Sequence, residues 1–210
     1  MSLYPKIESP FKRYTDGPNR NKFIAGEWVR PEFAMLRRLD WLWTEKIDGT
    51  NIRVMWDGHK VRFGGRTDDA QMPTFLMSTL VDMFPEELME QAFGDGEIIL
   101  YGEGYGPKIQ KGGGLYRKDP SFILFDVKAG KWWLERDNVE SVAGNLGIAT
   151  VPVKAVGSVD DAISLVSAGV KSSFGDFWAE GLVGRAPLGL LTRAGDRILM
   201  KIKHKDLFLG

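Results

Sequence analysis

The 210-residue sequence lacks cysteine and has only two histidines, His59 and His204. The absence of cysteine excludes disulfides, thiolate zinc sites and cysteine nucleophiles, and two histidines do not make a multi-histidine metal cage. No apolar run approaches the ~20 residues of a membrane span, and no signal-peptide hydrophobic region follows Met1, so we expect a soluble, cytoplasmic protein. Catalytic chemistry therefore has to come from lysine, arginine, aspartate and glutamate.

An excess of charge of one sign is also missing, because 28 Lys and Arg balance 28 Asp and Glu. A neutral chain differs from the basic proteins that coat nucleic acid. The bases nevertheless gather in two stretches, from Lys108 to Lys118 and from Arg193 to Lys205. Each stretch is either an ordinary solvated face or a local phosphate-binding surface, and the sequence leaves both interpretations open.

The dominant period of hydrophobic residues is two, which indicates β-strands. Asp57-Gly58 predicts a hairpin turn between strands at 51–56 and 60–63. Further strands are expected at 97–103 and 121–127, and a terminal hairpin at 190–193 and 197–203. Helices are expected at 74–84, 85–93, 137–146 and 159–168, the last with Ser158 as its N-cap and Gly169 as its end. Because the strands do not alternate regularly with helices, we predict an α+β fold with mainly antiparallel sheet.

The segment from Glu45 to Asn51 places a lysine directly after a strand rich in tryptophan. Lys46 and Asp48 have the same parity, so an extended backbone points both side chains to one side. One interpretation is a surface ion pair beside a turn. The other is a lysine nucleophile at the mouth of a pocket, which has to lose its proton and therefore needs further positive charge nearby.

Lys201 and Lys203 can supply that charge. Strand alternation puts both on one face and Ile202 on the other. Two lysines on one face repel each other unless an anion, such as a triphosphate, lies between them. The alternative is a solvent-facing edge strand that its lysines protect from pairing.

Six short motifs occur in order from about Tyr4 to Lys203. They are Lys46-Ile47-Asp48-Gly49, Gly65-Arg66, Tyr101-Gly102-Glu103-Gly104, Phe122 to Asp126, Glu180-Gly181-Leu182-Val183 with Arg185 beyond it, and Lys201-Ile202-Lys203. Together they resemble the signatures of the covalent nucleotidyltransferases, namely DNA ligases, RNA ligases and mRNA-capping enzymes. Thr50-Asn51 and the glycine-rich stretch from Gly104 to Gly114 resemble, more narrowly, the bacteriophage-type RNA ligases that repair nicked duplex RNA.

The resemblance implies a reaction in which Lys46 attacks the α-phosphate of ATP and forms lysyl-AMP. AMP then passes to a 5′-phosphate end, and a 3′-hydroxyl displaces it to seal the strand. The implied cofactors are ATP and Mg²⁺ or Mn²⁺. The implied catalytic residues are Lys46, Glu180, Lys201 and Lys203. The implied nucleotide contacts are Glu45, Lys46, Ile47, Asn51, Arg66, Glu103, Phe122, Glu180, Lys201 and Lys203. Arg66, Lys111 and Arg185 would contact the substrate phosphate or RNA, and Glu180 and Asp48 would hold the metal through water.

Three of these assignments have a structural alternative. Phe122 is either the aromatic that stacks on adenine or a core residue of a buried strand. Asn51 either binds a phosphate or holds the turn beside Gly49. The glycine-rich segment after Lys111 is either a lid or RNA-facing loop, or a simple linker.

The resemblance implies a nucleotidyltransferase (ATP-grasp-like) fold, in which helices flank antiparallel sheets and the nucleotide pocket lies between them. We expect a single domain over residues 1–210, without a C-terminal OB-fold or helical domain. The expected partner is RNA with 5′-phosphate and 3′-hydroxyl ends, nicked in a duplex, and no membrane. The alternatives are a DNA ligase or GTP-dependent capping-type enzyme on the same scaffold, and a catalytically silent nucleic-acid-binding module.

Overall fold

The computed structural model describes residues 3–207, which divide into two compact units. Unit 1 comprises residues 3–4 and 47–151, and unit 2 comprises residues 5–46 and 152–207. The chain therefore leaves unit 2 after Lys46 and returns to it after Val151. Each unit has its own sheet and its own hydrophobic core. The expectation of a single domain stays a prediction.

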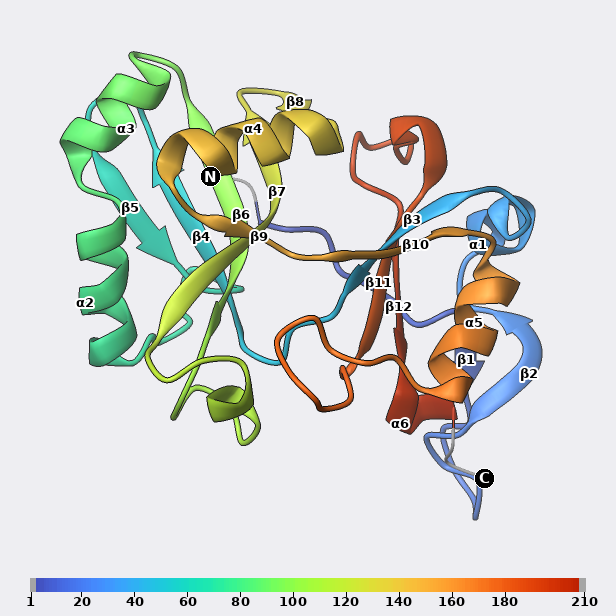
Figure 1. Ribbon diagram of the computed structural model, residues 1–210. Coiled ribbons are helices and arrows are strands. Elements are labelled where there is room, and N and C mark those ends of the chain that lie inside the picture. Colours follow the sequence, from blue (N-terminus) through green and yellow to red (C-terminus); the bar gives the residue numbers. More distant parts are fainter. Residues whose placement is uncertain (1–2, 208–210) are drawn as a thin grey trace. The chain divides into compact units, whose positions relative to one another are not determined.

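Unit 1 contains a six-stranded sheet with the strand order β5-β4-β6-β7-β8, and β9 pairs with β7 (Figure 1). The β7–β9 pair is parallel, and the other pairs described in this sheet are antiparallel. The elements of unit 1 are β4 (Thr50–Trp56), β5 (Val61–Gly64), α2 (Thr74–Met83), α3 (Glu86–Phe93), β6 (Ile98–Tyr105), the 3₁₀ turn η1 (Gly113–Leu115), β7 (Ser121–Ala129), β8 (Trp132–Trp133), α4 (Arg136–Leu146) and β9 (Ala149–Thr150).

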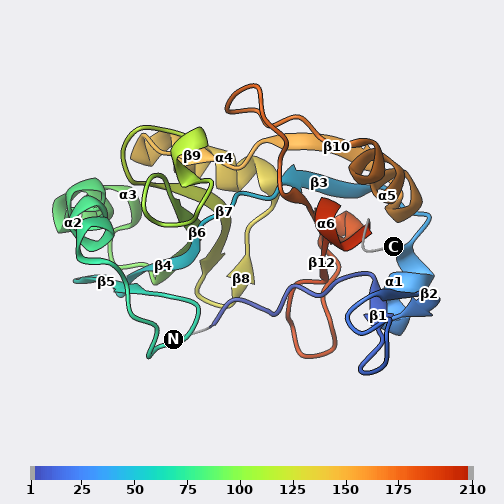
Figure 2. The same ribbon diagram turned by 90° about the horizontal axis from the view of Figure 1, so that it is seen from below.

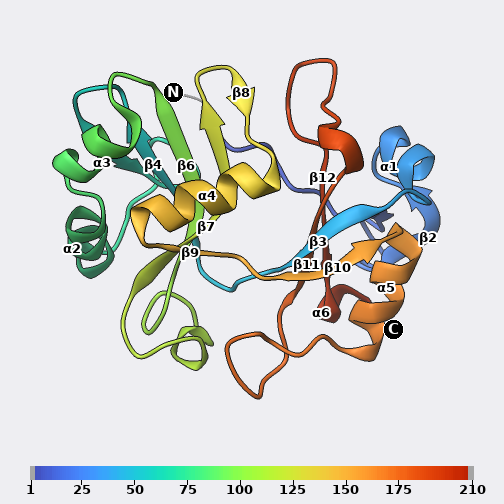
Figure 3. The same cartoon turned by 45° about the horizontal axis from the view of Figure 1, so that its top comes forward.

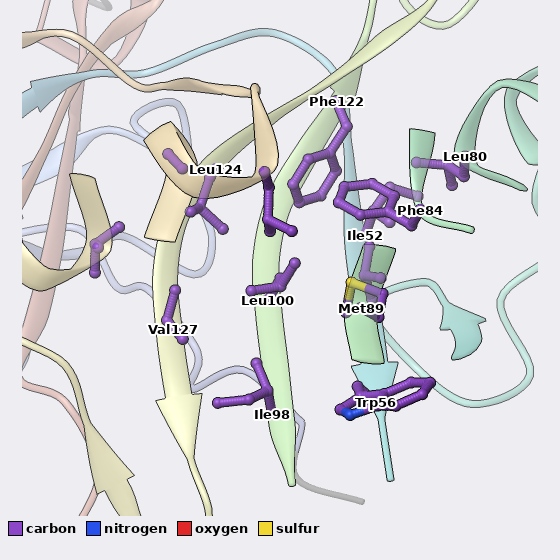
Figure 4. Packing of buried hydrophobic residues seen from close by; sticks show 14 of the residues in the cluster. Ile52, Trp56, Leu80, Phe84, Met89, Ile98, Leu100, Phe122, Leu124 and Val127 are labelled. Atoms are coloured by element: carbon purple, nitrogen blue, oxygen red, sulfur yellow. The ribbon is translucent and has the colours of Figure 1, made fainter. Parts of the chain in front are cut away.

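The core of unit 1 lies between one face of this sheet and helices α2, α3 and α4. Figure 3 shows α4 crossing β6 and β7. The alternation of β4 brings Ile52, Val54 and Trp56 to this face, where all three are buried. Figure 4 shows the rings of Phe122 and Phe84 next to each other in this cluster; they pack edge to face, with 5.3 Å between their centroids. Gly102 leaves room for Phe122, because a Cβ at Gly102 would lie 2.2 Å from the Phe122 ring.

Unit 2 contains a four-stranded antiparallel sheet with the order β10-β3-β11-β12 and a separate β1-β2 ribbon. Figure 2 shows β3 and β10 running side by side. The elements of unit 2 are β1 (Phe11–Arg13), β2 (Phe23–Trp28), α1 (Pro31–Leu36), β3 (Trp41–Glu45), β10 (Val153–Gly157), α5 (Val159–Ala168), β11 (Gly181–Arg185), the 3₁₀ turn η2 (Pro187–Gly189), β12 (Leu199–Lys203) and α6 (His204–Leu207).

The core of unit 2 is built around two stacked tryptophans of β3. Trp41 and Trp43 are fully buried, and their ring centroids lie 5.8 Å apart. Phe33 of α1 packs on Trp41, and α5 contributes further apolar side chains to the same cluster. Helix α5 begins with a capping box, because Ser158 and Asp161 each bind the other's backbone N–H. This cap fixes the start of the helix that covers the sheet.

The structure confirms the α+β prediction, and the predicted helices and the hairpin at Asp57-Gly58 agree within a residue or two at their ends. The predicted strand at 190–193 is wrong. Only the pair Leu191–Arg197 forms there, as an isolated bridge, because β12 begins only at Leu199 and its ladder partner is β11. Within residues 3–207, no helix is long and apolar enough to cross a membrane.

Candidate functional site

Lys46 and Lys203 share one carboxylate in unit 2. Lys46 Nζ donates to Glu180 Oε2 at 2.5 Å, and Lys203 Nζ lies 2.6 Å from Glu180 Oε1. The three side chains are 17–20% exposed, so the cluster is mostly shielded from water yet open on one side. The positive charge that the sequence required near Lys46 is therefore present, and Lys203 supplies it.

The strand register explains why residues so distant in sequence meet. Lys46 follows the last residue of β3, and its backbone N–H donates to the carbonyl of Gly181 at 3.0 Å. Gly181 is in turn the partner of Lys203 across β11 and β12. Adjacent strand ends thus bring Lys46, Glu180 and Lys203 to one place, and no loop has to close over them.

The two lysines determine the charge state of Glu180. Burial alone would raise the pKa of this carboxyl, but the charges of Lys46 and Lys203 and their hydrogen bonds outweigh burial and hold the pKa below its ordinary value of 4.5. Glu180 is therefore a carboxylate at neutral pH. A carboxylate beside two ammonium groups is suited to orienting cations or water around an anionic ligand.

Lys201 and Arg185 lie on the same face of the sheet as Lys203. Ile202 is buried in the core on the opposite face, as the alternation predicted. Lys201 lies two residues before Lys203 on β12, opposite Val183. It lines a separate hollow together with residues of the segment 6–13. Arg185 ends β11 opposite Leu199 and is half-buried. The structure thus places Lys203, and not Lys201, in the immediate cluster with Lys46.

The side chain of Glu45 has a different environment from the one expected of a nucleotide contact. It is fully buried and accepts hydrogen bonds from Ser172 Oγ at 2.6 Å and from the backbone N–H of Ser173 at 2.8 Å, and Lys154 Nζ lies 3.8 Å away. Its Cα partner Leu182 belongs to the core face of the sheet. The carboxylate therefore anchors the segment 171–178, and the sequence offered no signal for the Ser172 and Ser173 contacts.

In unit 1, Asn51 of β4 and Glu103 of β6 are direct cross-strand partners and share one face of the sheet. Asn51 Oδ1 is buried, and the described residues contain no hydrogen-bond partner for it. A buried acceptor without a partner is costly, which favours a ligand that donates a hydrogen bond there. Asn51 and Glu103 are therefore neighbouring polar groups on this face.

Phe122 lies on the other face of the sheet. It is opposite Gly104, whereas Glu103 is opposite Ile123, so the side chains of Phe122 and Glu103 point away from each other. With 1% of its surface exposed, Phe122 is a core aromatic, the structural alternative that the sequence left open.

Phe125 is the aromatic of β7 that lies on the face of Glu103. A β-bulge next to Phe125 shifts the pairing of β6 and β7, and Phe125 packs at 4.9 Å against Tyr4, which packs equally closely on Tyr101 of β6. Tyr101 and Glu103 are two residues apart on β6 and so share a face. Residue alternation could not single out Phe125, because both faces of β7 carry apolar residues.

Arg66 is exposed, and the segment that carries it is held by an arginine that sequence reasoning missed. Arg53 is fully buried; its Nε donates to the carbonyl of Gly65 at 2.8 Å and its Nη2 to Asp68 Oδ1 at 2.7 Å. The hydrogen bond and charge of Arg53 lower the pKa of Asp68. The sequence signal for this role was the position of Arg53 between the apolar residues Ile52 and Val54. Strand alternation alone, however, would have placed its side chain in solvent.

Asp48, Ile47 and Lys111 belong to the turn and the loop that follow Lys46 in unit 1. Ile47 is buried, whereas Asp48 is half-buried and its backbone N–H donates to the Tyr116 hydroxyl at 3.2 Å. Lys111 is exposed, and the neighbouring Gln110 donates to the carbonyl of Gly49 at 3.1 Å. The glycine-rich loop therefore folds back onto the turn at 48–49. Among the described residues, no group of three or more His, Asp or Glu is arranged to hold a metal directly.

Comparisons with known proteins place this geometry in a family. The sequence model of a family described as RNA ligase matches residues 39–203. A comparison with curated proteins found no match. Among solved structures, an RNA ligase mutant of Naegleria gruberi with ATP and Mn has a TM-score of 0.67 and 16% identity, over 97% of this chain and 64% of that chain.

Two further structures of the Naegleria gruberi RNA ligase are similar. A mutant with AMP and Mn has a TM-score of 0.65 and 17% identity, over 84% of this chain and 53% of that chain. The form with PPi has a TM-score of 0.65 and 16% identity, over 97% of this chain and 62% of that chain. This chain thus spans between 53% and 64% of the length of these three chains, and the likeness shows a shared fold.

Proposed function

The chain belongs to the RNA ligase family, and from that premise we propose that it is an ATP-dependent RNA ligase in which Lys46 is the nucleophile. The observation that carries the proposal is the pairing of Lys46 and Lys203 with one carboxylate, Glu180. A structural ion pair needs one lysine, whereas a phosphate-transfer site needs several positive charges around the reacting group.

The first step forms a bond between Lys46 Nζ and the α-phosphorus of ATP and breaks the bond to pyrophosphate. Nζ attacks as a free amine, so its ammonium group first gives up a proton to solvent, since the lowered pKa of Glu180 makes that carboxylate a weak base. Lys203, which pairs with Glu180 in this structure, would neutralise the charge of the α-phosphate. Lys201 and Arg185, on the same face of the sheet, would be further phosphate contacts. Positioning and charge neutralisation carry most of the rate in such a reaction.

The donor set suits a divalent metal bound through water. Lys46 and Lys203 occupy the two oxygens of Glu180, so this carboxylate is placed to orient water around a cation once a phosphate draws the lysines away. Asp48 is proposed as a second carboxylate with the same task. Bound Mg²⁺ or Mn²⁺ would supply charge neutralisation on the departing pyrophosphate.

Unit 1 provides the groups proposed to hold the nucleoside. Glu103 would accept hydrogen bonds from the ribose hydroxyls, and Asn51 Oδ1 would accept a further one. Phe125 takes the stacking role in place of Phe122, since it lies on the face of Glu103. Arg66 and Lys111, both exposed, would contact the phosphates of the incoming strand.

In the two later steps, the 5′-phosphate of a strand attacks lysyl-AMP and releases the Lys46 amine, and a 3′-hydroxyl then displaces AMP. The narrower proposals are that the ends lie at a nick in duplex RNA, that the chain resembles the bacteriophage-type enzymes and that it acts in the cytoplasm. Sealing assays on nicked RNA, RNA–DNA hybrid and DNA duplexes separate an RNA ligase from a DNA ligase.

Incubation with α-labelled ATP and Mg²⁺ tests the central step. Label should become bound to the protein, and Lys46→Ala should abolish it. Lys12→Ala is the matched control, because Lys12 is an exposed lysine of the same unit that pairs only loosely with Glu27, at 3.4 Å. Labelling that persists in Lys46→Ala, or a folded parent protein that takes up no label, contradicts the proposal. Preferential labelling by GTP would indicate the capping-type alternative.

A further inference from the structure

A hollow of about 420 Å³ lies beside Glu180 in unit 2. It is lined by three small residues, an indole, one carboxylate and two basic side chains: Ala168, Gly169, Ala179, Trp178, Glu180, His204 and Lys205. The backbone N–H of His204 donates to the carbonyl of Glu180 at 3.1 Å, so the wall that carries His204 and Lys205 is tied to the proposed catalytic carboxylate.

Trp178 is held in an exposed position by its own loop. The indole is 60% exposed, and its six-membered ring rests on Gly169, where an added Cβ would lie 2.8 Å from the ring. Lys171 pairs with Trp178 across the loop, and Ser172 is tied to buried Glu45 at 2.6 Å. A large aromatic that a well-bonded loop keeps in solvent is suited to stacking on a ligand.

The charges around the hollow favour an anionic ligand with a flat apolar part. Lys171 Nζ lies 4.5 Å from the Trp178 ring centroid, and Lys205 is exposed at the rim. The nearby acids are already paired, since Asp176 lies 2.5 Å from Lys171 and Glu180 holds Lys46 and Lys203. Pyrophosphate fits poorly, because much of the wall consists of alanine, glycine and indole.

We propose that this hollow binds a nucleobase of the polynucleotide strand next to its reacting end, with the base stacked on Trp178 and a backbone phosphate at Lys205. The inference rests on the proposed function, since Glu180 connects the hollow to Lys46. It adds a strand contact that lies wholly within unit 2.

The test is binding of a 5′-phosphorylated oligoribonucleotide, labelled with a fluorophore at its 3′ end, to the full chain without ATP. Trp178→Ala should weaken binding about 5- to 150-fold, the loss expected for one base–aromatic stack. Trp132→Ala is the matched control, because Trp132 is even more exposed, at 79%, but lies on β8 of unit 1. Trp178→Phe should restore part of the affinity and shows whether loss in the alanine variant reflects stacking.

Two further arms identify the ligand. Removing the base of the 5′-terminal nucleotide should weaken binding of the oligonucleotide to the parent and leave its binding to Trp178→Ala unchanged. Lys205→Gln should lower the slope of log affinity against log salt by about 0.7, as expected for one lost phosphate contact on a single strand.

Equal affinity of Trp178→Ala and the parent, or an equal effect of base removal on both, overturns the inference. The inference is also overturned if Trp178→Ala binds AMP more weakly than the parent but binds the oligonucleotide equally well. The base in the hollow would then be that of the cofactor. If Lys46 takes up label but Trp178→Ala leaves oligonucleotide binding unchanged, this inference alone is contradicted. Strand binding that depends on Trp178 without label contradicts the proposed function alone.

Discussion

Replacing Glu180 with glutamine should destabilise the protein at neutral pH and have little effect in acid. Glutamine keeps the shape of the side chain but removes the charge that Lys46 and Lys203 share. Each ammonium–carboxylate contact contributes roughly 4 kcal/mol before desolvation at an effective dielectric constant of about 20. The two ammonium groups repel each other by roughly 2 kcal/mol at the separation of at most about 7 Å that the contacts of 2.5 and 2.6 Å allow, and this repulsion is left uncompensated in the variant unless the lysines move apart.

Desolvation of the partly buried carboxylate, which glutamine avoids, and movement of the flexible lysines toward solvent in the variant together offset most of the lost attraction, so the net loss on substitution should be about 1–3 kcal/mol. Because the folded pKa of Glu180 lies below its ordinary value of 4.5, this stabilisation is complete above that value. It is lost as the pH falls through the folded pKa, where the protonated carboxyl resembles glutamine. The difference between the parent and Glu180→Gln should therefore shrink toward zero in acid.

Urea unfolding followed by tryptophan fluorescence, from about pH 7 downward, measures this difference. Asp176→Asn is the matched control: Asp176 pairs with Lys171 at the same 2.5 Å, but its side chain is 93% exposed, so the substitution should change stability little at any pH. A Glu180→Gln loss that stays constant with pH, or that equals the Asp176→Asn loss at neutral pH, would show that the charge of Glu180 does not stabilise the folded protein.

Three further substitutions test the fold around the candidate site. Gly102→Ala should cost about 1–3 kcal/mol in urea unfolding, because the new methyl group meets the Phe122 ring; an unchanged midpoint would contradict the packing. Arg53→Met should cost about 1–3 kcal/mol by leaving the Gly65 carbonyl without its donor, and should speed amide exchange at residues 64–68; unchanged exchange there would show that Arg53 does not hold this segment. Ser158→Ala should cost about 1 kcal/mol and speed exchange in the first turn of α5, and equal exchange in parent and variant would argue against the cap.

Sequence reasoning succeeded where short-range periodicity decides the answer. Strand parity placed Ile202 on the face opposite to Lys201 and Lys203. The need for charge near Lys46 pointed to both lysines, of which the structure brings Lys203 to the cluster. The start of α5 followed from Ser158 alone, because a capping box is a local motif.

Sequence reasoning failed where tertiary pairing decides which face of a strand is the core. Both faces of β7 are apolar, so strand alternation put Phe122 and Phe125 on different faces without showing which face is the core. The bulge at Phe125 could not be predicted either, because no residue type marks it. Glu45 and Lys46 are adjacent, yet Ser172 engages the first and Glu180 the second. These partners lie more than 120 residues away, and no local pattern specifies them.

The chain order of the two units has a consequence for how the protein is made. The stretch 47–151 that forms nearly all of unit 1 is continuous, whereas unit 2 joins residues 5–46 to residues 152–207. On the ribosome, the first part of unit 2 must wait for its partner strands while the interior stretch is synthesised and can fold. Lys46 is synthesised early, but it can meet Glu180 and Lys203 only after residue 203 has emerged. A nascent chain that ends before these residues would therefore carry the proposed nucleophile without the charges that surround it, and by the proposed mechanism it would not react with ATP.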